Sequence, residues 1–444
     1  MTTPPEPSLD LALTPEELRE TWDLLSDEER AEGFHALGRI DQEDFFLESS
    51  SRDQLHLLSS LPQAERRAWL RLLAPDDTAD LLQLHPPEER PGLLALLDEA
   101  TRREVSALLA YAEDDAGGLM NPRFARVRPD MSVDEAITYL RRQARDRVET
   151  IYYAYVLDAD QRLLGVTSFR DLFTARPDQQ VQDAMVRDVV TVRDDMDQEA
   201  VSRVFAQHDL IAVPVVDAEG RMRGLVTVDD IVDVVQEEAT EDIQRLGGTE
   251  ALGAPYLDMS MGSMVKKRAG WLAALFLGEM LTATAMASYE DEIAKAVVLA
   301  LFVPLIISSG GNSGSQATTL VIRAMALGEV RLRDWWRVAR REVFSGLGLG
   351  LILGAIGVTR ILVWQGMFHT YGEHAVAVAA TVGLSLVGVV LWGCLAGSML
   401  PFLLRRLGLD PASASAPFVA TLVDVSGLVI YFTVASIVLA GRLL

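Results

Sequence analysis

Cysteine is almost absent from this chain of 444 residues, which holds a single thiol at Cys394. One cysteine cannot form an intrachain disulfide, and because Cys394 lies inside an apolar run we expect it to be a small packing residue. The opening residues, MTTPPEPSLDL, lack both the basic region and the apolar run of a signal peptide. The sequence therefore predicts that the N-terminal half stays in the cytosol.

Lysine is missing altogether from residues 1–260, where 26 Arg stand against 54 Asp plus Glu and the net charge is −28. Residues 261–444 hold 14 Lys plus Arg against 10 acids, a net charge of +4. A strongly acidic surface repels nucleic acid and attracts cations, so we expect no nucleic-acid partner. An ordinary solvated acidic surface is the alternative interpretation. The asymmetry indicates an acidic soluble half joined to a membrane half.

The second half contains five apolar segments, each long enough to cross a hydrocarbon core of ~30 Å as a helix of about 20 residues. They are residues 269–288, 296–326, 342–364, 375–403 and 417–441. Basic residues gather before the first segment, between the second and third, and between the fourth and fifth. By the positive-inside rule this pattern predicts that the N-terminus is in the cytosol and the C-terminus is outside.

The second apolar segment is unusually polar along PLIISSGGNSGSQATTL, residues 304–320. Lipid cannot satisfy so many hydroxyl and amide groups, so these residues have to face protein or a water-filled path. The alternative is that the small residues only allow close helix contact, although contact alone would not require Asn312 and Gln316.

The last apolar segment contains a carboxylate, Asp424. Such a group costs at least ~2.5–3.5 kcal/mol at the bilayer centre. Pro417 removes an amide donor nearby, which can leave a carbonyl without its helical partner. Carboxylate and carbonyl oxygens suit Mg²⁺, and two chains on a two-fold axis would each place one Asp424 on a path for a hydrated ion. The rival interpretation is a proton-relay carboxylate, and Glu279 is interpreted as a packing or interface residue.

The soluble half contains an internal repeat, in which residues 154–173 align with residues 213–232 at a constant shift of 59. Each copy reads as strand, turn, strand and helix start, and is too small to be stable alone, so the two copies are expected to share one core. The repeat is similar to a tandem pair of CBS domains, a module that senses adenosine nucleotides and other small effectors. Its nucleotide-type positions are Gly165, Ser168 and Asp171 in the first copy and Gly224, Thr227 and Asp230 in the second.

Two further regions flank this repeat. Residues 11–111 read as short helices that start with Pro or acidic residues, which predicts a superhelical bundle. In residues 229–242, seven of 14 side chains are acidic and none is basic. Like charges one turn apart destabilise a helix, and bound divalent cations would cancel their repulsion, so this run is a candidate cation sensor. A solvated acidic linker helix is the alternative.

Four motifs in a fixed order carry a resemblance to one family. They are AEDDAGGLM (112–120), VQEEATEDIQRLGG (235–248), VPLIISSGGNSGSQATTLVIRA (303–324) and LDPASASAPFVATLVDVSGLVIYF (409–432). In these motifs the chain resembles the MgtE family of magnesium channels along nearly its full length. The resemblance implies a multidomain fold: an α-helical N domain (1–118), an α/β tandem CBS pair (119–245), a connecting helix (246–268) and an all-α five-span pore domain (269–444).

The resemblance further implies a Mg²⁺-selective channel, closed by cytosolic Mg²⁺, that works as a homodimer within the lipid of the cell membrane. Asp424 would face hydrated Mg²⁺. The other pore residues carried over by position are Ala420, Ser308, Gly311, Ser315 and Thr319. The regulatory acids so carried over are Asp76, Asp80, Asp197, Glu199, Asp209, Asp230, Asp233, Glu238, Glu241 and Asp242. Some members of the family bind ATP between the CBS domains, for which Arg170 and Asp171 are the candidates here.

Two positions depart from the family pattern. Ser315 stands where the common GGNxGNQ motif has its second Asn, and Ala416 precedes Pro417 where some members have a polar side chain. Both departures bear on discrimination between Mg²⁺ and Co²⁺, Ni²⁺ or Mn²⁺.

Three other functions compete with the channel. The first is an H⁺- or Na⁺-coupled divalent-cation transporter, in which Asp424 would exchange the coupling ion. The second is a membrane-tethered nucleotide receptor, against which five polar-faced spans argue because one plain helix would serve as an anchor. An enzyme is the least favoured, since the sequence has no HExxH motif and no Cys–His nucleophile pair.

Overall fold

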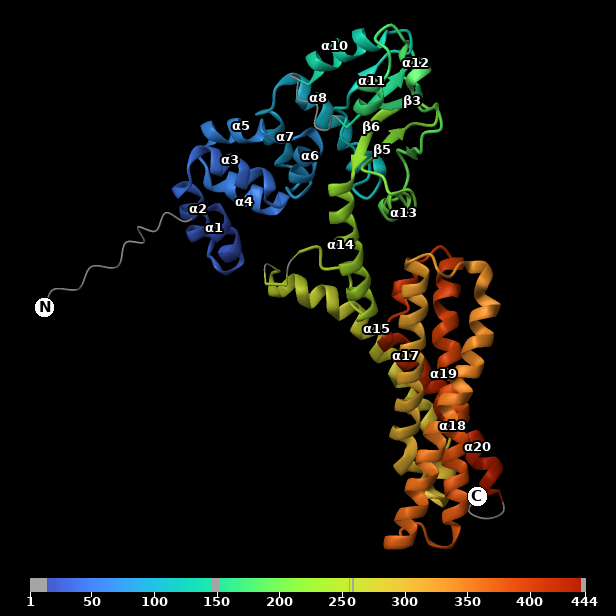
Figure 1. Cartoon of the computed structure of the whole chain (residues 1–444). Coiled ribbons are helices and arrows are strands. Elements are labelled where there is room, and N and C mark those ends of the chain that lie inside the picture. Colours follow the sequence, from blue (N-terminus) through green and yellow to red (C-terminus); the bar gives the residue numbers. More distant parts are fainter. Residues whose placement is uncertain (1–13, 145–151, 255, 258, 441–444) are drawn as a thin grey trace, which may run out of the picture. The chain divides into compact units, whose positions relative to one another are not determined.

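The computed structural model describes residues 14–144, 152–254, 256–257 and 259–440 (Figure 1). The opening residues, for which no signal peptide is predicted, lie outside this range. The chain divides into two compact units between Gln236 and Glu237.

The first unit begins with a set of short helices, as the sequence predicts. They are α1 (Pro15–Thr21), α2 (Asp27–Ala36), α3 (Arg39–Glu48), α4 (Ser51–Ser60), α5 (Gln63–Leu70), α6 (Pro75–Gln83), α7 (Arg90–Leu94) and α8 (Glu99–Leu108). Thr14 and Ser26 close capping boxes with Glu17 and Glu29, which satisfies the first amide donors of α1 and α2. The helices bury an aromatic core that includes Phe34, Phe46 and Trp69, so the helical N domain is confirmed.

The repeat folds into two three-stranded sheets of identical topology. Strands β1 (Arg126–Val127), β2 (Tyr153–Leu157) and β3 (Leu163–Ser168) form one sheet, and β4 (Val192–Arg193), β5 (Ala212–Val216) and β6 (Met222–Thr227) form the other. In each sheet the first two strands are parallel and the last two antiparallel. The helices of this region are α9 (Ala116–Leu119), α10 (Val133–Gln143), α11 (Phe169–Thr174), α12 (Val181–Ala184), α13 (Gln198–His208) and α14 (Val228–Leu246).

The two copies share a core, as expected for units that are too small to be stable alone. Tyr155 and Leu157 of the first sheet pack with Met222 and Leu225 of the second. The amide of Met222 also donates a hydrogen bond of 2.9 Å to the carbonyl of Gln161. The CBS-like pair is therefore confirmed as part of the multidomain fold.

The second unit is helical. Its elements are α15 (Met261–Ala287), α16 (Glu290–Lys295), α17 (Val303–Ala326), α18 (Trp335–Phe368), α19 (Ala375–Arg406) and α20 (Ala416–Leu439), joined through the short turns Val297–Phe302, Leu332–Asp334, Gly372–His374 and Pro411–Ser413. By length and composition, five helical segments in the described part of the chain can cross a membrane. They are Met261–Ala287, Val297–Ala326, Leu332–Phe368, Gly372–Arg406 and Ala416–Leu439.

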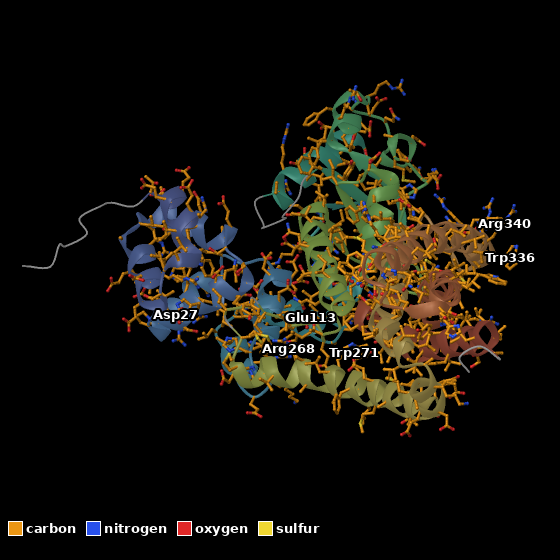
Figure 2. The ribbon with its side chains drawn as sticks, turned by 90° about the horizontal axis from the view of Figure 1, so that it is seen from below. Asp27, Glu113, Arg268, Trp271, Trp336 and Arg340 are labelled. Atoms are coloured by element: carbon orange, nitrogen blue, oxygen red, sulfur yellow. The ribbon has the colours of Figure 1, made fainter. Side chains whose placement is uncertain are left out.

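Two of these helices begin earlier than the apolar pattern predicts, at Met261 and Trp335 instead of residues 269 and 342. The extra turns carry charged and aromatic side chains, including Arg268 on α15 and Trp336 and Arg340 on α18, and Trp271 follows just inside the predicted segment; all four are labelled in Figure 2. A helix satisfies its own backbone in water as well as in lipid, so hydropathy marks the apolar core of a span and not its ends. Trp and Arg at these levels are typical of a membrane interface.

Helices α17 and α19 pack with their backbones in contact. A Cβ atom added to Gly397 would lie 2.8 Å from the carbonyl carbon of Gly314, and one added to Gly393 would lie 3.1 Å from the carbonyl carbon of Gly310. The hydroxyl of Thr318 donates to the carbonyls of Gly314 (2.9 Å) and Gly397 (2.8 Å). Small residues at this crossing therefore hold α17 in a fixed position.

Gly397→Ala is expected to lower the free energy of unfolding by about 1–3 kcal/mol, because the added methyl group overlaps the backbone of α17. The matched control is Gly348→Ala on α18, where an added Cβ would meet nothing within 4 Å. Thermal unfolding of both variants in detergent measures the difference. Equal unfolding midpoints for the two variants would contradict the close packing.

Candidate functional site

The N-terminal cap of α20 fixes the position of Asp424 along the helix axis. The Ser415 hydroxyl accepts a hydrogen bond from the amide of Phe418 (3.3 Å) and another from the indole of Trp271 (3.2 Å). Pro417 lies in the first turn of the helix, where no intrahelical donor is required, so it leaves no carbonyl unpaired inside α20. The expectation that Pro417 exposes a carbonyl is therefore wrong. Asp424 follows nine residues after the cap, about 13 Å along the helix.

Gly311 on α17 faces Asp424. A Cβ atom at Gly311 would lie 3.4 Å from Cα of Ala420 and 3.8 Å from Oδ1 of Asp424. Any larger side chain at position 311 would therefore crowd the carboxylate. The structure brings Gly311, Ala420 and Asp424 together, as the sequence predicts for a pore site.

Ser315 lies one turn further along α17 and makes a specific contact with α20. Its hydroxyl donates a 3.1 Å hydrogen bond to the carbonyl of Ala416. The two positions that depart from the family pattern are therefore bonded to each other. This contact ties α17 to the first turn of α20 and uses the hydroxyl proton of Ser315 within the protein.

One face of α17 is polar and uncovered in this chain. Ser308, Asn312, Gln316 and Thr319 are exposed and recur at helical spacing, while Gly310, Gly314 and Ala317 on other faces are buried. Within the described residues the side chains of Asn312 and Gln316 make no hydrogen bond. A polar stripe along a membrane-spanning helix requires water or a protein partner, because lipid offers no hydrogen bonds. Ser308 and Thr319 belong to this stripe, and within the described part of the chain neither forms a hydrogen bond with Asp424.

The acids that are predicted to be regulatory form several groups. Asp230, at the start of α14, accepts hydrogen bonds from the hydroxyl (2.7 Å) and the amide (3.2 Å) of Thr227. Burial raises the pKa of Asp230 to about 6, and the neighbouring charges of Asp229 and Asp77 contribute to this rise. Burial also raises the pKa of Asp77, with a contribution from Asp229. Asp77, Asp229 and Asp230 therefore interact as one electrostatic group between α6 and α14.

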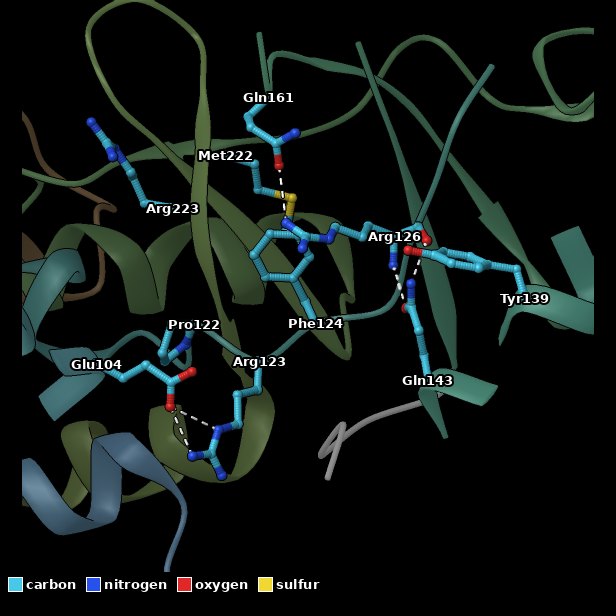
Figure 3. A pocket seen from close by; sticks show the side chains of 10 residues that line it. All are labelled: Glu104, Pro122, Arg123, Phe124, Arg126, Tyr139, Gln143, Gln161, Met222 and Arg223. Carbon is cyan, nitrogen blue, oxygen red and sulfur yellow. Dashed lines mark hydrogen bonds and ion pairs between the residues drawn. The ribbon is translucent and has the colours of Figure 1, made fainter. Parts of the chain in front are cut away.

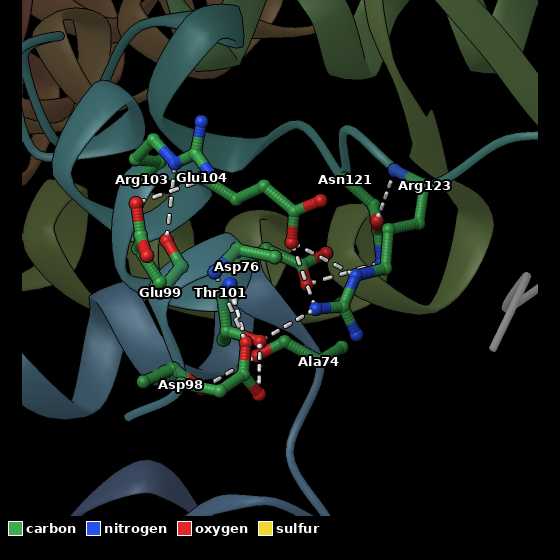
Figure 4. A network of polar contacts seen from close by, with 11 residues as sticks. Ala74, Asp76, Asp98, Glu99, Thr101, Arg103, Glu104, Asn121 and Arg123 are labelled. Carbon is green, nitrogen blue, oxygen red and sulfur yellow. Dashed lines mark hydrogen bonds and ion pairs between the residues drawn. The ribbon is translucent and has the colours of Figure 1, made fainter. Parts of the chain in front are cut away.

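Sequence reasoning missed Asp77 and selected Asp76 and Asp80 on α6 instead. Asp229 was part of the acidic run 229–242 but was not selected individually. Asp76 is buried and accepts a 3.1 Å hydrogen bond from the side-chain amide of Asn121, as Figure 4 shows. Asp80 is exposed. The dipeptide Asp76–Asp77 is visible in the sequence, but only the packing of α6 tells which carboxylate turns toward α14.

The acids around α13 are used locally in this chain. Asp197 caps α13 by accepting from the amides of Glu199 (3.0 Å) and Ala200 (3.3 Å), and Glu199 forms a 2.8 Å ion pair with Arg203. Asp209 adopts a left-handed conformation (φ 51°) where α13 ends.

A second acidic group, also missed by sequence reasoning, lies where Asp115 pairs through its backbone with Asp197. Burial raises the pKa of Asp115, and the neighbouring carboxylates raise it further. Those carboxylates are Asp114, Asp194, Asp195 and Asp197. Asp114 and Asp115 of the motif AEDDAGGLM therefore belong to this acidic group, whereas the sequence analysis used the motif only as part of the resemblance to a family.

The acids further along α14 are not gathered into a cluster. Asp233 is exposed, and Glu238 and Asp242 are half-buried. Glu241 forms an ion pair with Arg245, which also pairs with Asp410 in the turn before α20. Burial alone would lower the pKa of Arg245, but these two carboxylates raise it.

No group of three or more His, Cys, Asp or Glu side chains in the described ranges is arranged to hold a metal ion. The predicted regulatory ligands are therefore distributed over several places in a single chain. At one of these places the predicted ligand Glu241 already forms an ion pair with Arg245, which is shared with Asp410.

The first unit also contains an open pocket of about 420 Å³, shown in Figure 3. Its lining includes Arg123, whose guanidinium donates two hydrogen bonds, of 3.0 Å and 2.7 Å, to the carboxylate of Glu104. It also includes Arg126, which donates a 3.0 Å hydrogen bond to the side chain of Gln161. Neither of the residues predicted to bind ATP lines this pocket. Arg170 is exposed, and Asp171 accepts a 2.6 Å hydrogen bond from Ser168 in the capping box of α11. ATP binding at this pair stays a prediction.

Three family models match successive parts of the chain. The model described as MgtE intracellular N domain matches residues 13–114, the CBS domain model matches 116–178 and 181–237, and the model described as MgtE, divalent cation transporter, matches 303–434.

Individual relatives match over a greater length. The chain is 43% identical to the magnesium transporter MgtE of Thermus thermophilus over 428 residues, which is 96% of this chain and 93% of that protein. It is 34% identical to the magnesium transporter MgtE of Enterococcus faecalis, over 75% of this chain and 71% of that protein. A solved structure of the cytosolic domain of the Mg²⁺ channel MgtE in complex with ATP shares 44% identity and covers 50% of this chain and 90% of that one, with a TM-score of 0.47.

Proposed function

The chain belongs to the MgtE family of magnesium transporters, and from this premise we propose that it is a Mg²⁺-selective channel that cytosolic Mg²⁺ closes. Membership in a family of membrane transporters confirms that the chain is a multi-pass membrane protein and not an enzyme. The selectivity, the gating and the arrangement of two chains are parts of the proposal.

The uncovered polar stripe of α17 beside Asp424 is the observation that carries the proposal. Ser308, Asn312, Gln316 and Thr319 would complete a water-filled path when a second copy of this chain packs against the same face. Each copy then contributes one Asp424. Because Mg²⁺ releases its water reluctantly, two carboxylates facing each other across a path suit a hydrated ion better than a dry cage of ligands.

The orientation in the proposal has the N-terminus in the cytosol and the C-terminus outside. Basic residues lie at the start of α15, between α17 and α18, and at the end of α19, all of which would then be cytosolic. With this orientation the acidic first unit samples cytosolic Mg²⁺.

The connecting segment gives the proposed gate a route to the pore helix. Gly248, which has a left-handed φ of 74°, lies against the indole of Trp271 and the ring of Pro417. Leu246 packs against Ala412 and Ala414 in the turn before α20. We infer that Mg²⁺ bound among the acids near Asp77 and Asp230 draws the cytosolic helices together, and that the shift reaches α20 through the segment around Gly248.

A flux measurement distinguishes the channel from the coupled transporter. In liposomes clamped at matched pH and without Na⁺, Mg²⁺ entry is expected to follow the membrane voltage, since a divalent ion gains ~4.6 kcal/mol per 100 mV. Protein-free liposomes are the control. Entry that occurs only with a proton or Na⁺ gradient would instead support the H⁺- or Na⁺-coupled transporter.

A further inference from the structure

Glu279 lies on α15 at the level of Asp424. The contacts between α15 and α20 progress along both helices: the rings of Trp271 and Phe418 are 6.1 Å apart, and a Cβ atom at Gly278 would lie 2.8 Å from Cγ2 of Thr421. Glu279 follows Gly278 directly, and Asp424 lies one turn beyond Thr421 on the same side of α20. The absence of a side chain at Gly278 lets the two helices approach each other closely at this level.

The carboxylate of Glu279 has no counter-ion in its surroundings. It is exposed and makes no ion pair within the part of the chain that the structure describes. The basic residues of its own helix are 11 or more positions away, at Lys266, Lys267 and Arg268, which is about 16 Å along the axis. A carboxylate facing lipid at this depth would be strongly unfavourable. Water, a cation or a second copy of the chain therefore has to solvate Glu279.

The two acids also lie near each other. The contact of Gly278 with Thr421 places the two carboxylates within about one helical turn of each other along the axis. Two carboxylates of the same chain at one level attract a divalent ion more strongly than a monovalent one, because the Coulomb energy scales with the charge of the ion. Glu279 was interpreted as a packing or interface residue, and packing does not account for a charge placed at this position; an interface between two copies would bring the charge to the path that the two copies share.

We propose that Glu279 is a specificity-determining residue of the ion path, which concentrates hydrated divalent cations at Asp424 and favours them over monovalent cations. This inference rests on the proposed function, in which Asp424 lines the path. Asp424 contacts the hydrated ion, whereas Glu279 contributes its field and accepts hydrogen bonds from the ion's outer water.

Replacement of the charge tests this role. With Glu279→Gln, the Mg²⁺ concentration for half-maximal liposome flux is expected to rise about tenfold, and Na⁺ is expected to compete more effectively. Glu342→Gln on α18, also a carboxylate within a span, is the matched control and should behave as wild type. Wild-type half-saturation and wild-type Na⁺ competition in Glu279→Gln would overturn the inference.

A second variant keeps the test decisive if Glu279→Gln does not fold. In Glu279→Cys the native thiol, Cys394, is buried, so water-soluble thiosulfonate reagents can reach the introduced thiol selectively. A negatively charged reagent is expected to restore low half-saturation and a positively charged one to raise it further. Equal effects of the two reagents, or no reaction, would overturn the inference. If Asp424→Ala leaves flux unchanged, the ion path lies elsewhere and the part of the proposed function on which this inference rests fails, whereas a silent Glu279 with an inactive Asp424→Ala rejects only this inference.

Discussion

Asp424→Ala is expected to reduce Mg²⁺ flux into liposomes by at least about 100-fold, which corresponds to about 2.7 kcal/mol. At a separation of one water layer and an effective dielectric of about 20, a carboxylate attracts a divalent ion by several kcal/mol. Gly311 and Ala420 lie beside Asp424 and offer no charge to replace it. Fluxes are compared at a fixed voltage, matched pH and equal protein content.

Two further variants separate charge from shape at this position. Asp424→Asn keeps the size of the side chain and is expected to lose nearly as much flux as Asp424→Ala, whereas Asp424→Glu keeps the charge and should retain part of it. Asp291→Ala, on the short helix α16, is the control for removal of an acid elsewhere. Wild-type flux in a folded Asp424→Ala variant would place the ion path elsewhere.

The second large effect is expected at the acids between α6 and α14. In Asp77→Asn and Asp230→Asn, the cytosolic Mg²⁺ concentration that halves the flux should rise about five- to tenfold, or about 1–1.4 kcal/mol per site. The reason is that Asp77, Asp229 and Asp230 repel one another, and the energy released when Mg²⁺ neutralises them falls when one charge is already absent. Asp178→Asn, at an exposed carboxylate of the same unit, should leave the dependence unchanged.

The pKa of Asp230 gives this prediction a second readout. Its pKa is raised to about 6 from an ordinary value of 3.8, so the associated stability is complete below pH 3.8 and is lost as the pH rises through 6. At pH 7.5 the charged form therefore costs about 2–3 kcal/mol in the absence of Mg²⁺. Asp230→Asn should unfold at a higher temperature than wild type at pH 7.5, and the difference should shrink toward pH 5 or on addition of Mg²⁺. A difference that is constant with pH would contradict the burial of this charge.

Local patterns in the sequence were sufficient to predict the helices and strands, but not the tertiary contacts between them. Apolar runs located the five spans and the repeat located the two sheets, because each pattern is confined to a single element. The ion pair of Arg245 with Asp410 joins residues 165 positions apart, and no periodicity relates them. The choice between Asp76 and Asp77 depends on the side of α6 that packs inward, which is fixed by tertiary contacts.

The residues predicted to line the pore also show that contacts between helices are difficult to predict from sequence. The resemblance to a family placed Gly311, Ala420 and Asp424 in one site, and the structure does bring these three together. The resemblance did not reveal that the hydroxyl of Ser315 donates a hydrogen bond to the carbonyl of Ala416. The effect of a substitution at one motif position depends on the residue that it contacts on another helix.

The hydroxyl of Thr318, shared between the carbonyls of Gly314 and Gly397, restricts how this membrane unit can open. Sliding or rotation of α17 past α19 would break the hydrogen bond from Thr318 to Gly397, whereas the bond to Gly314 lies within α17 itself. The same movement would force glycine backbones into collision, so these two helices are expected to move as a single rigid block. Helix α15 packs mainly against α20 and carries few buried side chains. In the proposed channel, widening of the ion path is therefore expected to displace α15 against a stationary wall, and the glycines of α17 would keep that wall still.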